Sequence, residues 1–401
     1  MTSFQYDFID DASFDPADSA ASLSDLCRSL VESVQLLAYA IPQTGLIEAK
    51  ILLARHIERD TEVVTRLNNR IRELGRTIDV QAARVVDQEK AITCFEDESG
   101  HLLPSGIYAT KAELLASIAK RKAHTHPLWD EPSYRVLAFA SEVLSDEIAD
   151  FNRIKVFAKR VPPSSETIKG APLRDGRLAV VPDSRMQLKS ESADRNLAEL
   201  MHHTLMGTEI PTIEMTAGLI RDFPDTPWEF VVDISRQLWD EARHAEMCIK
   251  RCRQAGFDIG DFPCDHKTWS LTNGKPLELR LAIHQRIGEW LGVDAAIEWT
   301  RRLEANSDLR TVGLLNFIVE DEIAHVAIGN KWLRNLCQSE ERIWAIHEQA
   351  EKVRAEASGP VNGHIPLPLN VDSCLRSGFG EKEIERLAEK REVVVTKVGD
   401  L

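Results

Sequence analysis

The chain has 401 residues, and 49 Lys and Arg against 64 Asp and Glu give it a formal net charge of −15 at pH 7. Such a charge repels nucleic acid and anionic membrane surfaces. No apolar run reaches the roughly 18 residues of a membrane span, and the acidic N-terminal segment lacks the features of a secretory signal. The seven scattered cysteines suit a reducing compartment. We therefore expect a cytoplasmic protein without a membrane span.

Residues 1–159 predict a helical domain. Apolar residues recur at helical spacing over residues 23–41, 45–74, 76–92, 109–122 and 131–159. Asp60 falls on the apolar seam of the second of these helices. It is either a buried carboxylate of functional importance or the partner of a nearby arginine in a salt bridge.

The remainder of the chain divides into three parts. Residues 160–190 are rich in Pro, Gly and Ser and predict an extended linker with a short strand. Residues 191–358 predict a bundle of four main helices, and residues 359–401 an irregular arm with a short helix near 381–392. Cys248 and Cys252, four positions apart on one predicted helix, are interpreted as fillers of the core rather than a metal or redox pair.

A repeated motif marks the predicted bundle. Residues 240–244 read Asp-Glu-Ala-Arg-His, residues 321–325 read Asp-Glu-Ile-Ala-His, and each motif is followed by a lysine at the same offset. Residues three apart share one face of a helix, so each Glu-x-x-His points a carboxylate and an imidazole in one direction. Di-iron and di-manganese bundles use two such helices and one Glu from each of two others. Two further Glu-x-x-His pairs lack these matched flanks, Glu98/His101 and Glu199/His202.

Helix geometry supplies the two remaining carboxylates. A helix that contains Glu241 is predicted to begin near Trp228. Glu241 lies 13 positions after Trp228, and Glu209 lies 13 positions before Asp222, the predicted end of the preceding helix. In an antiparallel pair of helices these two glutamates therefore lie level with one another. The spacing from Glu209 to Glu241 recurs, to within one position, between Glu289 and Glu322 of the second motif. The predicted metal ligands are Glu209, Glu241, His244, Glu289, Glu322 and His325.

Pro211 leaves an alternative for the first ligand. A proline inside a helix removes a hydrogen bond, so the helix either bulges beside Glu209 or restarts at Pro211. In the second case Glu214 replaces Glu209, although the matched spacing favours Glu209. We expect Asp240 and Asp321 to hold the histidine of the opposite helix. Four carboxylates balance two divalent ions, and carboxylate with imidazole suits iron or manganese with open positions for O2.

Longer stretches of the sequence resemble a known family. They are the two motifs, the turn Phe-Pro-Asp-Thr-Pro at 223–227, and the segments 209–215, 259–263 and 368–370. Together they resemble a bacterial ferritin-like family of unknown function, from the superfamily of rubrerythrin-like and tRNA-hydroxylase-like di-iron proteins. The resemblance covers residues 191–392, and the sequence departs from the family pattern at Pro211 and at Gly207-Thr208, where histidines are expected. It implies an all-α protein: a ferritin-like four-helix di-metal bundle, here with an additional N-terminal helical domain.

These patterns predict a di-iron oxidase or oxygenase, with manganese as an alternative metal and O2 as co-substrate. The expected reaction is hydroxylation, N-oxygenation or desaturation of a small molecule, with an electron donor that the sequence does not identify. One alternative is a metal-binding protein for iron handling or peroxide removal. Another is a tRNA hydroxylase, which the net charge of −15 disfavours. The sequence is compatible with a homodimer.

Overall fold

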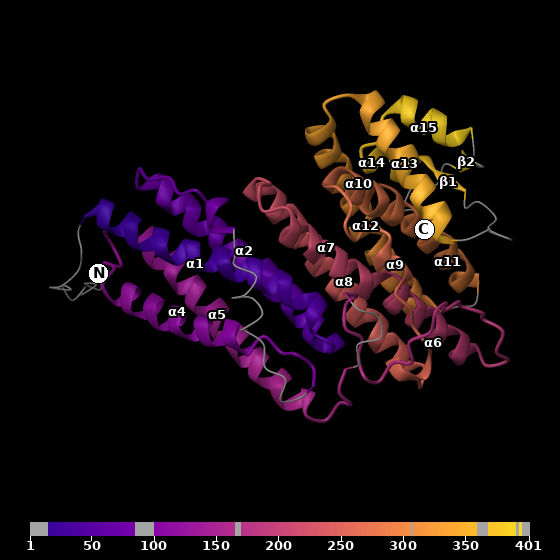
Figure 1. Cartoon of the computed structure of the whole chain (residues 1–401), viewed down its shortest axis with the longest axis horizontal. Coiled ribbons are helices and arrows are strands. Elements are labelled where there is room, and N and C mark those ends of the chain that lie inside the picture. Colours follow the sequence, from indigo (N-terminus) through magenta and orange to yellow (C-terminus); the bar gives the residue numbers. More distant parts are fainter. Residues whose placement is uncertain are drawn as a thin grey trace, which may run out of the picture. The chain divides into compact units, whose positions relative to one another are not determined.

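The computed structural model describes residues 15–84, 100–164, 170–305, 308–358, 368–389 and 393–394 (Figure 1). Regular structure in this part of the chain is almost all helical, as predicted. The exceptions are the short strands β1 (Leu369–Asn370) and β2 (Val393–Val394), which pair in parallel. None of the described helices is long and apolar enough to cross a membrane. The chain forms two compact units: Met1–Arg177 with Thr216–Ala242 (unit 1), and Leu178–Met215 with Arg243–Leu401 (unit 2).

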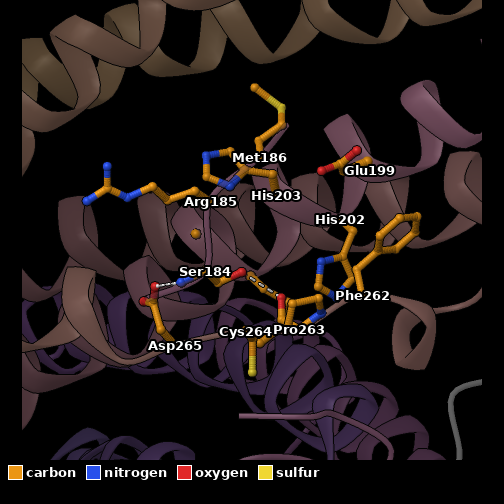
Figure 2. Close-up of a pocket in the computed structure, with 12 residues that line it drawn as sticks. Ser184, Arg185, Met186, Glu199, His202, His203, Phe262, Pro263, Cys264 and Asp265 are labelled. Atoms are coloured by element: carbon orange, nitrogen blue, oxygen red, sulfur yellow. Dashed lines mark hydrogen bonds between the residues drawn. The ribbon is translucent and has the colours of Figure 1, made fainter. Parts of the chain in front are cut away.

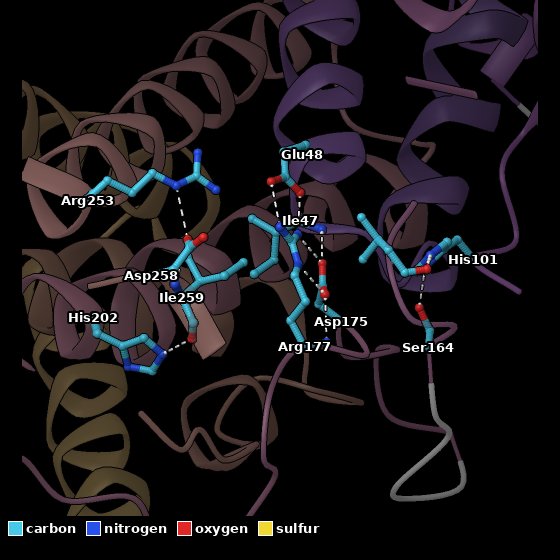
Figure 3. Close-up of polar contacts among 11 residues, drawn as sticks. Ile47, Glu48, His101, Ser164, Asp175, Arg177, His202, Arg253, Asp258 and Ile259 are labelled. Atoms are coloured by element: carbon cyan, nitrogen blue, oxygen red, sulfur yellow. Dashed lines mark hydrogen bonds and ion pairs between the residues drawn. The ribbon is translucent and has the colours of Figure 1, made fainter. Parts of the chain in front are cut away.

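Unit 1 contains four long helices that pack on one another, drawn from indigo to magenta in Figure 1. Asp15 caps the first helix by accepting a hydrogen bond from the Ala17 N–H, and Pro16 occupies the first helical position. At the start of the second helix, the Asp175 carboxylate accepts from the Ile47 N–H. Arg177 then binds both Asp175 and Glu48 (Figure 3). The four helices are α1 (Pro16–Gln43), α2 (Ile47–Glu73), α4 (Ser105–Ala123) and α5 (Glu131–Ala158).

The helix expected over residues 76–92 is wrong where the structure describes it. Gly75, at φ 77°, follows the end of the preceding helix, and only the short 3-10 helix η1 (Ala82–Arg84) comes after it. Residues 85–92 lie outside the described part. Arg84 explains the local geometry, because its guanidinium donates to the carbonyl oxygens of Ile220, Phe223 and Thr226. These contacts satisfy carbonyls at the end of a helix, where no amide of the helix itself can reach them.

Asp60 is buried, and its partner differs from the expected arginine. The Lys111 Nζ lies 2.7 Å from the Asp60 carboxylate, and both side chains are almost fully buried. Lys111 belongs to α4, whereas Asp60 belongs to α2, so sequence spacing could not reveal the pair.

Two helices contribute residues to both units. They are α7 (Ile210–Asp222) and α8 (Trp228–Gln254), and the first ends and the second begins at the predicted positions. The turn between them carries Pro224 and Pro227, neither of which can donate a backbone hydrogen bond. This local rule explains why the end of α7 and the beginning of α8 could be predicted from the sequence.

Unit 2 is built from long helices around which shorter ones pack. Residues 170–190 of the predicted linker contain no extended strand, and Val180 forms an isolated bridge with Cys264. At the turn before α12, Asp308 caps the helix by accepting from the Thr311 N–H and also binds Arg251. The helices are α6 (Ala193–Thr204), η2 (Leu205–Glu209), η3 (Ile259–Asp261), α9 (Lys267–Ser270), α10 (Leu277–Leu281), η4 (Ala282–Glu289), α11 (Trp290–Ala305), α12 (Leu309–Cys337), α13 (Glu340–Ser358), α14 (Val371–Arg376) and α15 (Glu381–Ala388).

The C-terminal helices pack onto the body of unit 2. Phe379 and Leu387 join a buried apolar cluster with Trp290 and Val326, so α14 and α15 cover α11 and α12. Arg286 of η4 reinforces this contact, because its guanidinium binds Glu383 of α15 at 2.5 Å and stacks over the Phe379 ring. The same guanidinium also contacts Asn330 of α12 and His347 of α13.

Candidate metal centre

All the predicted ligands are buried, and the structure gathers them into two groups. Within each group, one oxygen or nitrogen atom per residue lies within 4.8 Å of all the others. Both groups contain Glu241 and Glu322, which therefore lie between them. The first group adds Glu209 and His244; the second adds Glu289 and His325. A buried cluster of carboxylates and imidazoles with this spacing can hold a metal ion.

Glu209 stands at the end of the π-helix η2, where the chain forms a bulge. The N–H that follows, of Ile210, bonds to the carbonyl of Leu205, five positions back. In an α-helix the Gly207 carbonyl would bond to residue 211, but Pro211 has no N–H. The Thr268 hydroxyl donates to that carbonyl instead, at 2.7 Å. The structure thus has the bulge beside Glu209, and no restart of the helix at Pro211.

Glu289 stands at the end of a second π-helix, η4. Residues five apart share one face of such a helix, and the His284 Nε2 lies 2.9 Å from the Glu289 Oε1. Gly329 of α12 lets this helix approach closely, since a Cβ added there would lie 2.6 Å from the Gln285 Cβ. His284 was not among the predicted site residues, because nothing in the local sequence signals a π-helix.

His244 is oriented by a carboxylate of the opposite motif. Its Nε2 lies 3.1 Å from Asp321, as predicted, while its Nδ1 lies 3.4 Å from Glu209 and 3.3 Å from Glu322. Arg243 also binds Asp321, at 2.7 Å. Burial alone would raise the pKa of Asp321, but the bonds from His244 and Arg243 outweigh it and lower that pKa to about 2. An ionised Asp321 keeps the proton on Nε2 and directs Nδ1 towards the cluster.

The second group shows the electrostatic cost of this arrangement. Burial raises the pKa of Glu289, and the negative charge of Glu322 raises it further. His325 lies beside the same charge, with its Nδ1 3.2 Å from Glu322. Carboxylates packed this closely in a buried site need cations or protons to balance them.

Four further residues that the sequence singled out are Glu214, Asp240, Cys248 and Cys252. Glu214 is buried in α7 but belongs to neither group among the residues that the structure describes. Asp240 binds Arg236, one turn earlier on α8, at 2.9 Å. Cys248 and Cys252 are buried free thiols, as predicted for core fillers, and burial raises the pKa of Cys252 to about 11.

The unmatched Glu-x-x-His pair in α6 has a structural role. Glu199 accepts hydrogen bonds from the backbone N–H groups of Gln187 and Leu188. The His202 Nε2 lies 2.9 Å from the Ile259 carbonyl (Figure 3), and burial lowers the pKa of His202 to about 4. A neutral imidazole that donates to a backbone carbonyl holds two segments together.

A small cleft of about 50 Å³ opens beside η2 in unit 2 (Figure 2). Met206 and Gly207 of η2 form part of its wall, close before Glu209 in the chain. His203 lines the cleft next to Gly207, and burial lowers its pKa. Both apolar and polar atoms contribute to the lining of the cleft. The remaining lining residues are Ser184, Arg185, Met186, Glu199, His202, Phe262, Pro263, Cys264 and Asp265.

Comparisons with known proteins place the chain in a family. An uncharacterized protein of Haemophilus influenzae is 26% identical over 164 residues, which cover 40% of this chain and 54% of that protein. The chain thus matches about half the length of this relative. No solved structure matches the chain. A family model described as "Protein of unknown function (DUF455)" matches residues 134–385, more than half of the chain and all of the candidate metal ligands. The chain therefore belongs to the DUF455 family.

Proposed function

We propose that this protein is a di-metal carboxylate oxidase or oxygenase that uses O2 to oxidise a small organic molecule. The observation that carries the proposal is the pair of four-membered groups that share Glu241 and Glu322. Each group would hold one ion, and Glu241 and Glu322 belong to both groups; the di-iron bundles of the ferritin-like superfamily use the same kinds of ligand. The metals that suit this ligand set are iron and manganese.

The ligand set supports two ions rather than one. Glu209 and His244 would hold the first ion, and Glu289 and His325 the second. The distances of 3.2–3.4 Å between His244 or His325 and their neighbouring carboxylates are close to the roughly 3 Å between two ligand atoms that share one metal at about 2.1 Å. Four carboxylates and two divalent ions also balance in charge. A bound pair of iron ions would supply the redox chemistry that activates O2.

The protein's own groups would orient the site and admit a substrate. Asp321 fixes the His244 ring, and the His284 imidazole lies against one oxygen of Glu289. The cleft beside η2 is the candidate entrance, because Gly207 in its wall lies on the same π-helix as Glu209. Its mixed lining favours a small molecule with an apolar body and polar groups.

Metal analysis tests the proposal. The wild type, loaded with iron(II) or manganese(II) without oxygen, should hold two ions per chain. Glu241→Ala and Glu322→Ala should lose both ions, whereas Glu209→Ala should keep one. Glu199→Ala, in the unmatched motif, is the control and should keep two. A wild type that holds no more than one ion would contradict the proposal.

Measurements of oxygen consumption then distinguish an oxygenase from an iron-handling protein. An oxygenase should consume O2 in amounts that depend on an added organic substrate and an electron donor. Oxidation of many iron(II) ions per chain without any organic substrate would favour iron handling instead.

A further inference from the structure

The helix α13 contributes none of the predicted metal ligands, yet one of its side chains reaches the π-helix that carries Glu289. The Arg354 Nη1 donates a hydrogen bond to the carbonyl oxygen of Ile283, in the first turn of η4, at 3.2 Å. Burial lowers the pKa of Arg354, and the negative charge of Glu289 opposes this shift. The guanidinium, which has no lone pair to offer a metal, therefore lies near a residue of the second group.

Gly288 makes this contact possible. A Cβ built on Gly288 would lie 3.2 Å from the Arg354 Nη1 and 3.3 Å from the Ile283 oxygen. It would also lie 3.4 Å from the His284 Nδ1. The same imidazole contacts Glu289 through its other nitrogen, at 2.9 Å. A guanidinium, a carbonyl and an imidazole thus meet at one glycine, directly before Glu289 in the chain.

The position of Glu289 depends on the wide turns of η4. In a π-helix the residue five positions on shares a face with the starting residue, which sets Glu289 beside His284. In an α-helix, with about 3.6 residues per turn, Gly288 would take that place and Glu289 would be rotated by about 100°. Such a rotation would carry the Glu289 carboxylate away from the other members of the second group. Because π-helices are rare, contacts from neighbouring elements are needed to hold this register.

We propose that Arg354 is a positioning residue for the second ion, because its guanidinium holds η4 in the register that brings Glu289 to the second group. The guanidinium occupies one lone pair of the Ile283 carbonyl and so fixes the direction in which that carbonyl points. Gly288 belongs to the same device, since a side chain there would crowd the Arg354 Nη1. The inference rests on the proposed function, because it assigns a role at the same di-metal site.

The sign of the effect on metal binding separates this role from simple charge balance. A guanidinium near two divalent ions repels them, so its removal by itself would tighten metal binding. A guanidinium that holds the register has the opposite effect, because its loss releases Glu289. Contacts that orient a metal ligand typically change metal affinity by about 10–100-fold.

Zinc titrations by calorimetry test the inference, since zinc undergoes no redox chemistry. Arg354→Gln should bind one of the two ions about 10–100-fold more weakly than the wild type, and the other with unchanged affinity. Arg354→Lys, which keeps a hydrogen-bond donor, should recover part of the lost affinity. Lys352→Gln, which removes a charge from an exposed position of the same helix, is the control and should match the wild type. Gly288→Ala keeps the charge and should weaken the same ion, whereas Gly292→Ala, where a Cβ has open space, should not.

Amide hydrogen exchange of the metal-free protein gives a second readout that does not depend on bound ions. In Arg354→Gln, exchange at residues 284–290 should be faster by about 10–100-fold, as expected for the loss of one hydrogen bond from a charged donor. Lys352→Gln should leave this exchange unchanged. A wild type that binds a single ion would contradict the proposed function, and the exchange rates would still decide whether Arg354 holds η4. Tighter zinc binding by Arg354→Gln, or exchange as slow as in the wild type, would overturn the inference.

Discussion

Glu147→Gln should change the pH dependence of stability in unit 1. Burial raises the pKa of Glu147 to about 8 from the ordinary 4.5, and the charge of Asp60 adds to the shift against the opposing effect of Lys111. The folded state therefore binds the proton more tightly than the unfolded chain does. The resulting stabilisation is complete below about pH 4.5 and is lost as the pH rises through about 8.

The expected magnitude follows from the difference of one proton between the two states. Within this window the wild type should lose about 1.4 kcal/mol of unfolding free energy per pH unit. Glutamine keeps the shape of the side chain and does not titrate, so the unfolding free energy of the variant lacks this pH dependence. Relative to the wild type, Glu147→Gln should therefore gain about 2 kcal/mol between about pH 6 and about pH 7.5.

Amide hydrogen exchange of peptides from α2 and α5 measures this difference within unit 1. Exchange rates are corrected for the pH dependence of intrinsic exchange and converted to free energies of opening. Glu113→Gln, an exposed position on α4, controls for the loss of a surface carboxylate. A difference between Glu147→Gln and the wild type that stays constant from about pH 6 to about pH 7.5 would refute the reasoning.

Three further predictions concern unit 2. Gly329→Ala should lower the free energy of unfolding by about 1–3 kcal/mol and should lower metal occupancy, because its Cβ would meet the Gln285 Cβ at 2.6 Å. Thermal melting and metal analysis measure the two effects. Gly313→Ala, with open space on the same helix, is the control and should be neutral or stabilising. Glu383→Ala should lower the free energy of unfolding by about 3–5 kcal/mol, because it leaves the Arg286 guanidinium without its carboxylate partner. A thermal midpoint equal to that of the wild type would contradict this prediction. The reduced iron protein, mixed with O2, should give no stable tyrosyl signal in electron paramagnetic resonance, since unit 2 has no tyrosine; such a signal, lost in a Tyr→Phe variant, would count against it. The tyrosines of the chain are Tyr6, Tyr39, Tyr108 and Tyr134.

The sequence by itself determined the features that depend on local rules. The end of α7 and the beginning of α8 follow from the prolines between them, which cannot continue the hydrogen bonding of a helix. The candidate ligands followed from helix periodicity, because a fixed rise per residue converts matched spacing into matched height. That is why Glu209 could be paired with Glu241, and Glu289 with Glu322, without any knowledge of the fold.

Only the tertiary structure decided which distant groups meet. The bulge at Glu209 depends on the Thr268 hydroxyl, which is far in sequence from the Gly207 carbonyl that Pro211 leaves without an amide partner. Lys111, equally remote in sequence from Asp60, reaches that carboxylate because their helices pack within one unit. Local sequence carries no trace of such contacts. They form because a buried carbonyl or charge must find a partner, and the packing of the helices determines which partner lies within reach.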